Sequence, residues 1–306
     1  MRCCGADYWL PFFKIHDCFA YLHPYFMREL ILNDGQKIPI VGFGTYKAKE
    51  QEGIQAVIDA LNGGYRLIDT AAIYGNEETV GKGIKASGIP RDQLVVTTKV
   101  WREMLGYEQA KAALEQSLFR LGLDYIDLYL IHWPANARNY KNWQQTNADT
   151  WHAMEELQAE GKIRSIGVSN FWQEHLETLF QTAKVIPAVN QIEFHPGYWQ
   201  PELTEFCQTR GIAVEAWSPL ARGQVFGNKT LEKIANKHQQ SVAQVCLRWI
   251  VQHQVIVIPK STSAARIEEN IKLFDFELSE QEMKQIDELP EMGFSGELPN
   301  IWPDRV

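Results

Sequence analysis

Eight short apolar runs recur along the chain after residue 36, and a polar junction and a segment of helical periodicity separate each from the next. The runs cover residues 38–44, 65–69, 94–99, 126–132, 163–170, 187–193, 212–218 and 255–260. Near-continuous apolar runs of this length are typical of strands buried on both faces, as in a parallel sheet. Eight strand–helix units over about 270 residues match the size of a (β/α)8 TIM barrel, and we therefore expect this α/β fold.

The segments that flank these units predict smaller features. "LILNDGQKIP" places an Asn-Asp-Gly turn between apolar residues, which predicts an N-terminal β-hairpin that caps the barrel floor. The Gly- and Pro-rich tail after Pro290 predicts a short C-terminal surface loop. A doubly wound sheet is the rival architecture, but it needs Gly-x-Gly-x-x-Gly after the first strand, and "GFGTYK" (42–47) lacks the third glycine.

Composition restricts the class of partner. The chain has 306 residues, a formal net charge of −8 and no block of Lys and Arg, which argues against nucleic acid and anionic membranes as partners. No apolar run is long enough to span a bilayer. The five cysteines show neither metal-ligand spacing nor a disulfide framework, so a reducing cytoplasm is the simplest location.

The first 26 residues differ from the rest in their density of aromatic residues and cysteines. Charged residues interrupt their apolar runs and no small-residue cleavage site follows, which argues against a signal peptide. Met27 opens a sequence typical of the start of a domain. We expect residues 1–26 to be an extension of uncertain status, either an upstream translation artefact or a nonessential segment, and 27–306 to form one barrel domain.

Ionisable residues gather where the expected strands end. In such a barrel the active site lies at the carboxyl ends of the strands, and Asp69, Lys99 and His132 occupy three consecutive ends. Tyr74 follows on the loop after Asp69. A lysine ammonium lowers the pKa of a nearby phenol, and a buried lysine needs a carboxylate to stay charged. These four residue types suit the delivery of a proton to a developing alkoxide.

The sequence resembles the aldo-keto reductases. The matching stretches include "GFGTY", "GYRLIDTAAIYGNEETVG", "TTKVW", "LGLDYIDLYLIHWP", "GKIRSIGVSNF", "WSPLARG" and "IPKSTSAARIEEN", and they follow the order and spacing of that family from residue 28 to about 290. In its compact loops and short tail the chain is similar to the bacterial 2,5-diketo-D-gluconate/methylglyoxal reductases. The resemblance implies NADPH-dependent reduction of small aldehydes and ketones in the cytoplasm by a monomer or weak dimer.

The family's catalytic tetrad maps onto Asp69, Tyr74, Lys99 and His132. The resemblance implies that Tyr74 protonates the carbonyl oxygen while a hydride attacks the carbon. Lys99 with Asp69 would tune Tyr74, and His132 would orient the carbonyl. No metal is implied, and the strand ends lack the clustered His and Asp ligands that a metal-dependent hydrolase on this fold would need.

The resemblance also implies a cofactor site. Ser169, Asn170 and Gln191 correspond to residues that bind the nicotinamide carboxamide, and Trp217 takes the place of the aromatic side chain that stacks on the ring. Lys260, Ser261 and Arg266 correspond to the cluster around the adenosine 2′-phosphate; two cations and a hydroxyl suit a dianionic phosphate, which favours NADPH over NADH. The implied set is completed by Gly44 and Thr45 at the first strand end, Ser218, Leu220 and Gly223 at the pyrophosphate, and Thr262, Glu269 and Asn270 near the adenosine.

Tyr46, Trp101 and Trp133 are expected to form an aromatic substrate pocket, with Trp302 of the tail as a further member. Each site residue also has an ordinary interpretation: a helix cap, a solvated lysine, a packed aromatic or a core histidine. Other histidines, such as His175 and His238, are expected at the surface. The alternative function is an NADPH-binding sensor or regulatory subunit with little turnover, because a fold alone does not establish catalysis.

Overall fold

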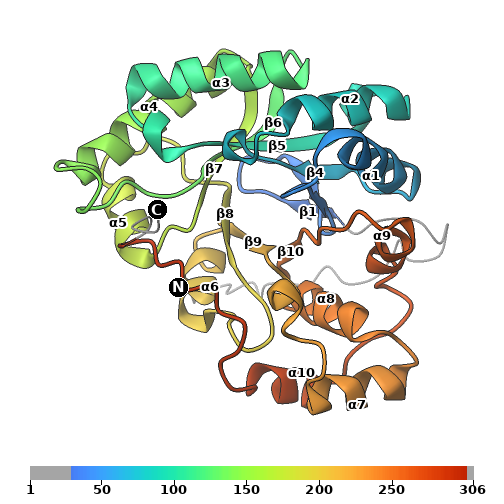
Figure 1. Ribbon diagram of the computed structural model, residues 1–306. Helices are drawn as coiled ribbons and strands as arrows, with labels where there is room; N and C mark the ends of the chain where they lie inside the picture. The colour runs from blue at the N-terminus through green and yellow to red at the C-terminus, as the bar shows by residue number, and fades with distance from the viewer. Residues whose placement is uncertain (1–28, 302–306) are drawn as a thin grey trace, which may run out of the picture.

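Eight parallel strands form the centre of the protein, whose computed structural model describes residues 29–301. The strands pair in chain order from β3 to β10, and the helices lie around the outside of the sheet (Figure 1). Their bounds are β3 (Phe43–Gly44), β4 (Leu67–Asp69), β5 (Val95–Val100), β6 (Ile126–Ile131), β7 (Ile163–Ser169), β8 (Val189–Glu193), β9 (Ala213–Trp217) and β10 (Ile256–Val257).

Backbone hydrogen bonds between the first and last strands close the sheet. The amide of Val257 donates to the carbonyl of Ile40 at 2.9 Å, and the amide of Gly42 donates to the carbonyl of Val257 at 2.8 Å. Gly44 sits at this seam, where a Cβ atom would lie 2.8 Å from the carbonyl oxygen of Ile258. A side chain there would push the strands apart. Because the first and last strands are hydrogen-bonded, the sheet is closed and the expected (β/α)8 barrel is confirmed.

Ten α-helices cover the barrel within the described residues, and each connection between consecutive barrel strands contains at least one. Two of them, α7 and α8, fill the connection between β9 and β10, as the sequence predicts. The helices are α1 (Glu50–Asn62), α2 (Glu77–Ser87), α3 (Tyr107–Leu121), α4 (Trp143–Ala159), α5 (Gln173–Phe180), α6 (Pro201–Gln208), α7 (Lys229–His238), α8 (Val242–Gln252), α9 (Ala264–Ile271) and α10 (Glu280–Asp287). None of the helices that the structure describes is long and apolar enough to cross a membrane.

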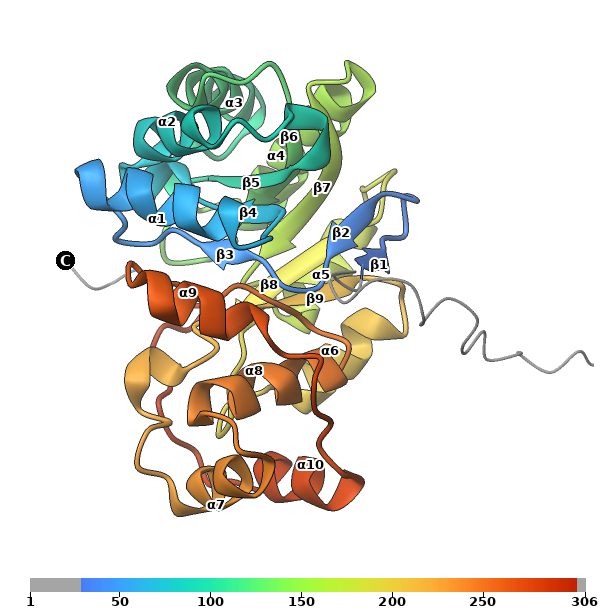
Figure 2. The ribbon, with the colours of Figure 1, turned by 90° about the vertical axis from the view of Figure 1, so that its right-hand side faces the viewer.

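A hairpin closes the floor of the barrel. Strands β1 (Glu29–Ile31) and β2 (Lys37–Pro39) pair antiparallel, and the hairpin lies beyond one end of the barrel strands (Figure 2). Leu32 and Ile38 bury their side chains in one cluster with Leu67 and Leu128 of the barrel interior. The hairpin is confirmed, but residues 38–44 do not form one strand, because Ile38 and Pro39 belong to the hairpin and regular pairing in the barrel begins only at Phe43.

The sequence predicts His175 at the surface, but the structure buries it. His175 is 2% exposed rather than at the surface, because it packs against the rings of Trp143 and Phe171.

The tail after α10 crosses to the carboxyl end of β8, where Ser295 donates to the Glu193 carboxylate. The proposed extension 1–26 and Trp302 lie outside the described residues, so the expectations placed on them stay predictions.

Candidate active site

A buried ion pair lies at the carboxyl ends of β4 and β5. Lys99 is fully buried, and its Nζ lies 2.6 Å from Oδ2 of Asp69 and 2.9 Å from the carbonyl oxygen of Thr70. Neighbouring parallel strands bring these ends together, since residues 69 and 97 are register partners. A buried ion pair is stable only when its geometry is good and further hydrogen bonds satisfy it. This one also receives a hydrogen bond at Asp69 from Nε2 of Gln191, at 2.9 Å.

Tyr74 and His132 lie above this pair. Tyr74 comes from the short 3₁₀ turn after β4 (Ala72–Tyr74), and Nζ of Lys99 lies 5.3 Å from the centre of its ring. The Tyr74 and His132 rings meet edge to face, with centroids 5.7 Å apart. The structure therefore brings Asp69, Lys99, Tyr74 and His132 together at one end of the barrel.

The electrostatics of this group differ from the expectation in one respect. The sequence predicts that Lys99 lowers the pKa of Tyr74, but burial of the phenol and then the Asp69 carboxylate raise that pKa well above its ordinary value. Asp69 offsets part of the field of the Lys99 ammonium at the phenol. Burial and Lys99 likewise hold the pKa of His132 well below its ordinary value. Tyr74 therefore carries its proton at neutral pH, and His132 is neutral.

A chain of hydrogen bonds joins this group to the residues that the resemblance assigns to the nicotinamide. Asn170 donates to the carbonyl of His132 at 2.9 Å and accepts from Nε1 of Trp217 at 2.8 Å. Ser169 donates to the carbonyl of Gln191 at 2.8 Å. The four side chains are thus held on three adjacent strand ends beside His132.

Residues assigned to the phosphates lie on the next strand ends. Lys260 and Arg266 are exposed near the start of α9, and neither has an ion-pair partner among residues 29–301. Ser261 is buried beside them and accepts from the amide of Ser263. The hydroxyl of Ser218, on the loop after β9, is buried and has no partner within the described chain. Two free cations and an orphaned hydroxyl are the groups that a phosphorylated dinucleotide uses, so these residues fit that cofactor.

The remaining members of the expected cofactor set lie at the end of β3, on the loop after β9 and around α9. Thr45 is fully buried, and its hydroxyl donates to the carbonyl of Asp69, so in this structure it holds the end of β4. Leu220 and Gly223 lie on the loop after β9, where Arg222 has a positive φ of 53°. Gly44 ends β3. Thr262 precedes α9, and Glu269 and Asn270 lie on that helix, with Asn270 buried. Their contacts with a cofactor stay predictions.

Aromatic side chains surround the opening. Tyr46 is 52% exposed and its ring centroid lies 5.0 Å from that of Tyr74. Trp101 meets His132 edge to face at 5.0 Å, and Trp133 is almost fully buried. These three side chains come from three different strand ends, and their expected role in a substrate pocket stays a prediction.

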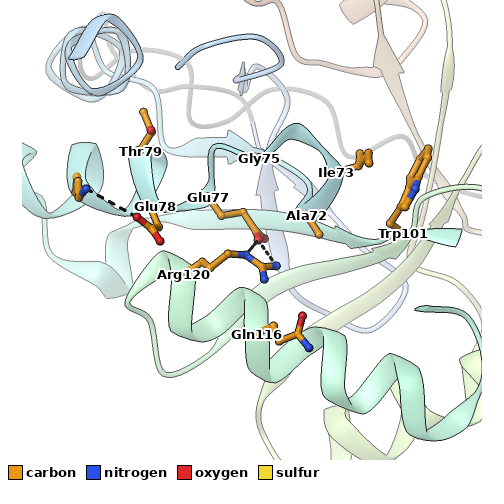
Figure 3. Close-up of a pocket in the computed structure, with 10 residues that line it drawn as sticks. Ala72, Ile73, Gly75, Glu77, Glu78, Thr79, Trp101, Gln116 and Arg120 are labelled. Carbon is orange, nitrogen blue, oxygen red and sulfur yellow. Dashed lines mark hydrogen bonds and ion pairs between the residues drawn. The ribbon is translucent and has the colours of Figure 1, made fainter. Parts of the chain in front are cut away.

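A surface hollow of about 560 Å³ lies outside the barrel, between α2 and α3 (Figure 3). Arg120 crosses it to Glu77 at 2.6 Å, and Glu77 in turn accepts from Thr98, the residue before Lys99. Trp101 and Ile73 lie at the end of the hollow that is nearest the barrel mouth. None of the four clustered residues lines it, so we do not assign the chemistry to this hollow. No group of His, Cys, Asp or Glu able to hold a metal occurs in the part of the chain described.

Sequence reasoning missed one ionisable residue close to this group. Glu215 is the third residue of β9 and is fully buried. An acid in the middle of the apolar run "IAVEAWS" is the signal that could have identified it, because a lone carboxyl is costly to bury.

Comparisons with known proteins identify relatives of this chain. The model of the Aldo/keto reductase family matches residues 40–291. The glyoxal reductase of Bacillus subtilis (strain 168) is 53% identical over 259 residues, which are 84% of this chain and 91% of that protein. An aldo/keto reductase from Brucella melitensis superposes with a TM-score of 0.81 at 47% identity, covering 85% of this chain and 98% of that one. The Bombyx mori aldo-keto reductase in complex with NADP gives 0.78 at 42% identity, with 85% and 92% covered.

Proposed function

The chain belongs to the aldo/keto reductase family, and we propose that it is an NADPH-dependent carbonyl reductase with Asp69, Tyr74, Lys99 and His132 as its catalytic residues. The observation that carries the proposal is the buried Lys99–Asp69 pair, 2.6 Å long, beside the rings of Tyr74 and His132. Packing alone does not require four ionisable side chains at this end of the barrel.

NADPH, when bound, supplies a hydride to the carbonyl carbon of the substrate. As the C–H bond forms, the carbonyl π electrons move to oxygen, and Tyr74 transfers its phenolic proton to that oxygen. The Lys99 ammonium then stabilises the phenolate that remains, while Asp69 keeps Lys99 charged. Neutral His132 donates a hydrogen bond that orients the carbonyl oxygen. The product is an alcohol.

The residues around the opening support NADPH as the cofactor. Lys260 and Arg266 have no partner in the described structure and suit the 2′-phosphate, and the Ser218 hydroxyl suits the pyrophosphate. Asn170, Ser169 and Gln191 would hold the carboxamide, and Trp217 would stack on the ring. The solved relative from Bombyx mori binds NADP, which agrees with this assignment.

For substrates we propose small carbonyl compounds: 2-oxoaldehydes such as methylglyoxal, keto sugars and keto acids such as 2,5-diketo-D-gluconate, and aromatic aldehydes. The glyoxal reductase relative favours the first of these classes. The aromatic rim formed by Tyr46, Trp101 and Trp133 suits flat or apolar substituents. A cytoplasmic location and a monomer or weak dimer remain predictions.

The proposal is tested by NADPH consumption with methylglyoxal, phenylglyoxal, glyceraldehyde, a benzaldehyde and 2,5-diketo-D-gluconate, with NADH in parallel. We expect turnover with NADPH that greatly exceeds turnover with NADH, and the highest kcat/KM with a 2-oxoaldehyde. Tight NADPH binding without turnover of any of these compounds would contradict the proposal and favour a cofactor-binding sensor.

A further inference from the structure

A second carboxyl group, that of Glu215, lies inside the barrel close to the Asp69–Lys99 pair. Glu215 is the register partner of Gln191 on β8, and register partners on neighbouring strands point to the same face of a sheet. The Gln191 side chain reaches Asp69, which lies four strands away, so this face is the barrel interior. Glu215 is fully buried there.

The two interior carboxyl groups differ in their hydrogen bonds. Asp69 receives the Lys99 ammonium at 2.6 Å and the Gln191 amide at 2.9 Å. Neither carboxyl oxygen of Glu215 has a hydrogen-bond partner of normal geometry among residues 29–301. One ammonium therefore faces two carboxyl groups and is paired with Asp69. An ionised carboxylate buried without donors is costly, and of two carboxyl groups that share one site, one keeps its proton.

We infer that Glu215 is a positioning residue for the proposed carbonyl reduction: as an uncharged acid it adds no second negative charge to that of Asp69 beside the Lys99 ammonium, which stabilises the Tyr74 phenolate. The inference rests on the proposed function. Among the described residues, the ionisable groups whose charges act with that of Glu215 are Asp69 from β4, Lys99 from β5 and Tyr74 from the turn after β4. When Tyr74 gives up its proton, a negative charge on Glu215 would oppose the phenolate and slow the reaction.

The protonation of Glu215 follows from its surroundings. Burial, and then the Asp69 carboxylate, raise the pKa of Glu215 to about 8, while Lys99 and Gln191 oppose the shift. The pKa of Tyr74 is raised well above 10, so Tyr74 does not lose its proton near pH 8. A decline of reduction near pH 8 that is absent in Glu215→Gln would therefore report the ionisation of Glu215.

The first test is the pH dependence of kcat at saturating NADPH, measured from pH 6 to 9.5 for the wild type and Glu215→Gln. We expect the two proteins to agree within about twofold at pH 6.5. At pH 9 the wild type should fall by about tenfold, because one pH unit above a pKa about a tenth of the acid remains, whereas Glu215→Gln should stay active. Loss of activity in Glu215→Gln at pH 6.5, or identical profiles, would overturn the inference.

Glu193 offers a matched control. It is also a buried carboxyl on a barrel strand, but it accepts from the hydroxyl of Ser295 at 2.7 Å and from the Ser295 amide at 3.0 Å. Because its charge is satisfied by donors outside the catalytic group, Glu193→Gln should keep the wild-type decline near pH 8. A decline abolished equally in both variants would mean that the effect is not specific to Glu215, and would overturn the inference.

A second test does not depend on turnover, so it separates this inference from the proposed function. A folded-state pKa raised from about 4.5 to about 8 means that the folded protein holds a proton that the unfolded chain has lost. The melting temperature of the wild type should therefore fall relative to Glu215→Gln as the pH rises from 5 to 8, and the difference should level off above 8. A difference that is constant over this range would contradict an uncharged Glu215, whether or not the protein reduces carbonyls.

If Glu215→Gln fails to fold, infrared spectroscopy of the wild type carries the same test. A protonated buried carboxyl gives a C=O band that is distinct from that of a carboxylate. We expect such a band at pH 6.5 and its loss by pH 10. Its absence at pH 6.5 would overturn the inference.

Discussion

The two ends of the barrel each hold a buried aspartate, but their surroundings differ. At the floor, Asp127 is bound by Arg91 at 2.5 Å, by Arg164 at 3.1 Å and by the amide of Val96 at 2.9 Å. Both guanidinium groups also stack on Tyr125, with ring-centre distances of 4.0 and 4.2 Å. Burial raises the pKa of Asp127, and the two arginines oppose the shift. Every cation in this cluster is thus used to satisfy one carboxylate.

At the mouth, the Asp69–Lys99 pair is more deeply buried than the Asp127–Arg91 pair. Three polar groups around it are buried without partners in the described part of the chain: Nδ1 of His132, the hydroxyl of Ser218 and the carboxyl group of Glu215. Buried polar groups are normally hydrogen-bonded, and exceptions concentrate at functional sites. Within the floor cluster, Nε of Arg91 is the one side-chain atom buried without a partner among the described residues. The floor cluster therefore satisfies its carboxylate, whereas the mouth cluster keeps several polar groups available for ligands and for proton transfer.

The largest expected difference in stability comes from removing one cation at each end. Lys99→Met would leave the Asp69 charge buried and unpaired, which costs about 3–5 kcal/mol. Arg164→Met should cost about 1 kcal/mol or less, because Arg164 is 41% exposed and Asp127 keeps Arg91. Urea denaturation of both variants measures the difference. Equal losses would mean that the two clusters play the same structural part.

A smaller effect is expected for Arg266, a cation without an ion-pair partner among the described residues. Arg266→Ala should weaken NADPH binding by about 1.5–3 kcal/mol, the usual range for hydrogen bonds to charged groups, and leave NADH binding almost unchanged. Calorimetric titration with both cofactors makes the comparison, and Arg164→Ala at the floor is the control, with both affinities expected at the wild-type level. A similar loss for NADH would exclude the 2′-phosphate as the partner of Arg266.

The smallest effect concerns two buried histidines. The pKa of His132 is held well below 6.5, and burial lowers that of His175 to about 4. As the pH falls below about 6.5, the unfolded chain binds protons that the folded protein does not, so each histidine reduces stability by at most about 1.4 kcal/mol per pH unit. The melting temperatures of His132→Gln and His175→Gln should therefore fall less than that of the wild type between pH 7 and 5.5. Only His132→Gln should also lose activity. If the melting temperature of both variants depended on pH as that of the wild type does, this would contradict neutral forms of His132 and His175 in the folded protein.

The sequence predicts much of this arrangement because strand order and strand ends follow from the apolar pattern. Asp69, Lys99 and His132 come together at the mouth because consecutive parallel strands place their carboxyl ends side by side. The fold and the grouping of these side chains could therefore be predicted from the chain alone. The split of the first apolar run could not, because Ile38 and Pro39 are apolar whether they pack in the hairpin or in the barrel.

Electrostatic properties were less predictable. The sequence shows that a lysine accompanies Tyr74, but not that Asp69 neutralises it and that burial raises the pKa of the phenol. In the same way, His175 has polar neighbours in sequence, and only the packing of the rings around it shows that it is buried. Burial and the net charge of a cluster depend on which side chains meet in space, and a local pattern does not contain that information.

The central claim is that Tyr74 delivers the proton in carbonyl reduction, and Tyr74→Phe tests it most directly. The measurement is kcat for methylglyoxal together with the Kd for NADPH, with Tyr46→Phe on the neighbouring ring as the control. General acid catalysis is worth about 10²–10⁴-fold, so we expect kcat to fall by that factor in Tyr74→Phe while the Kd stays within about twofold, and Tyr46→Phe to keep kcat near that of the wild type. A Tyr74→Phe protein that still turns over, or one that loses NADPH binding to the same extent as turnover, would contradict the account.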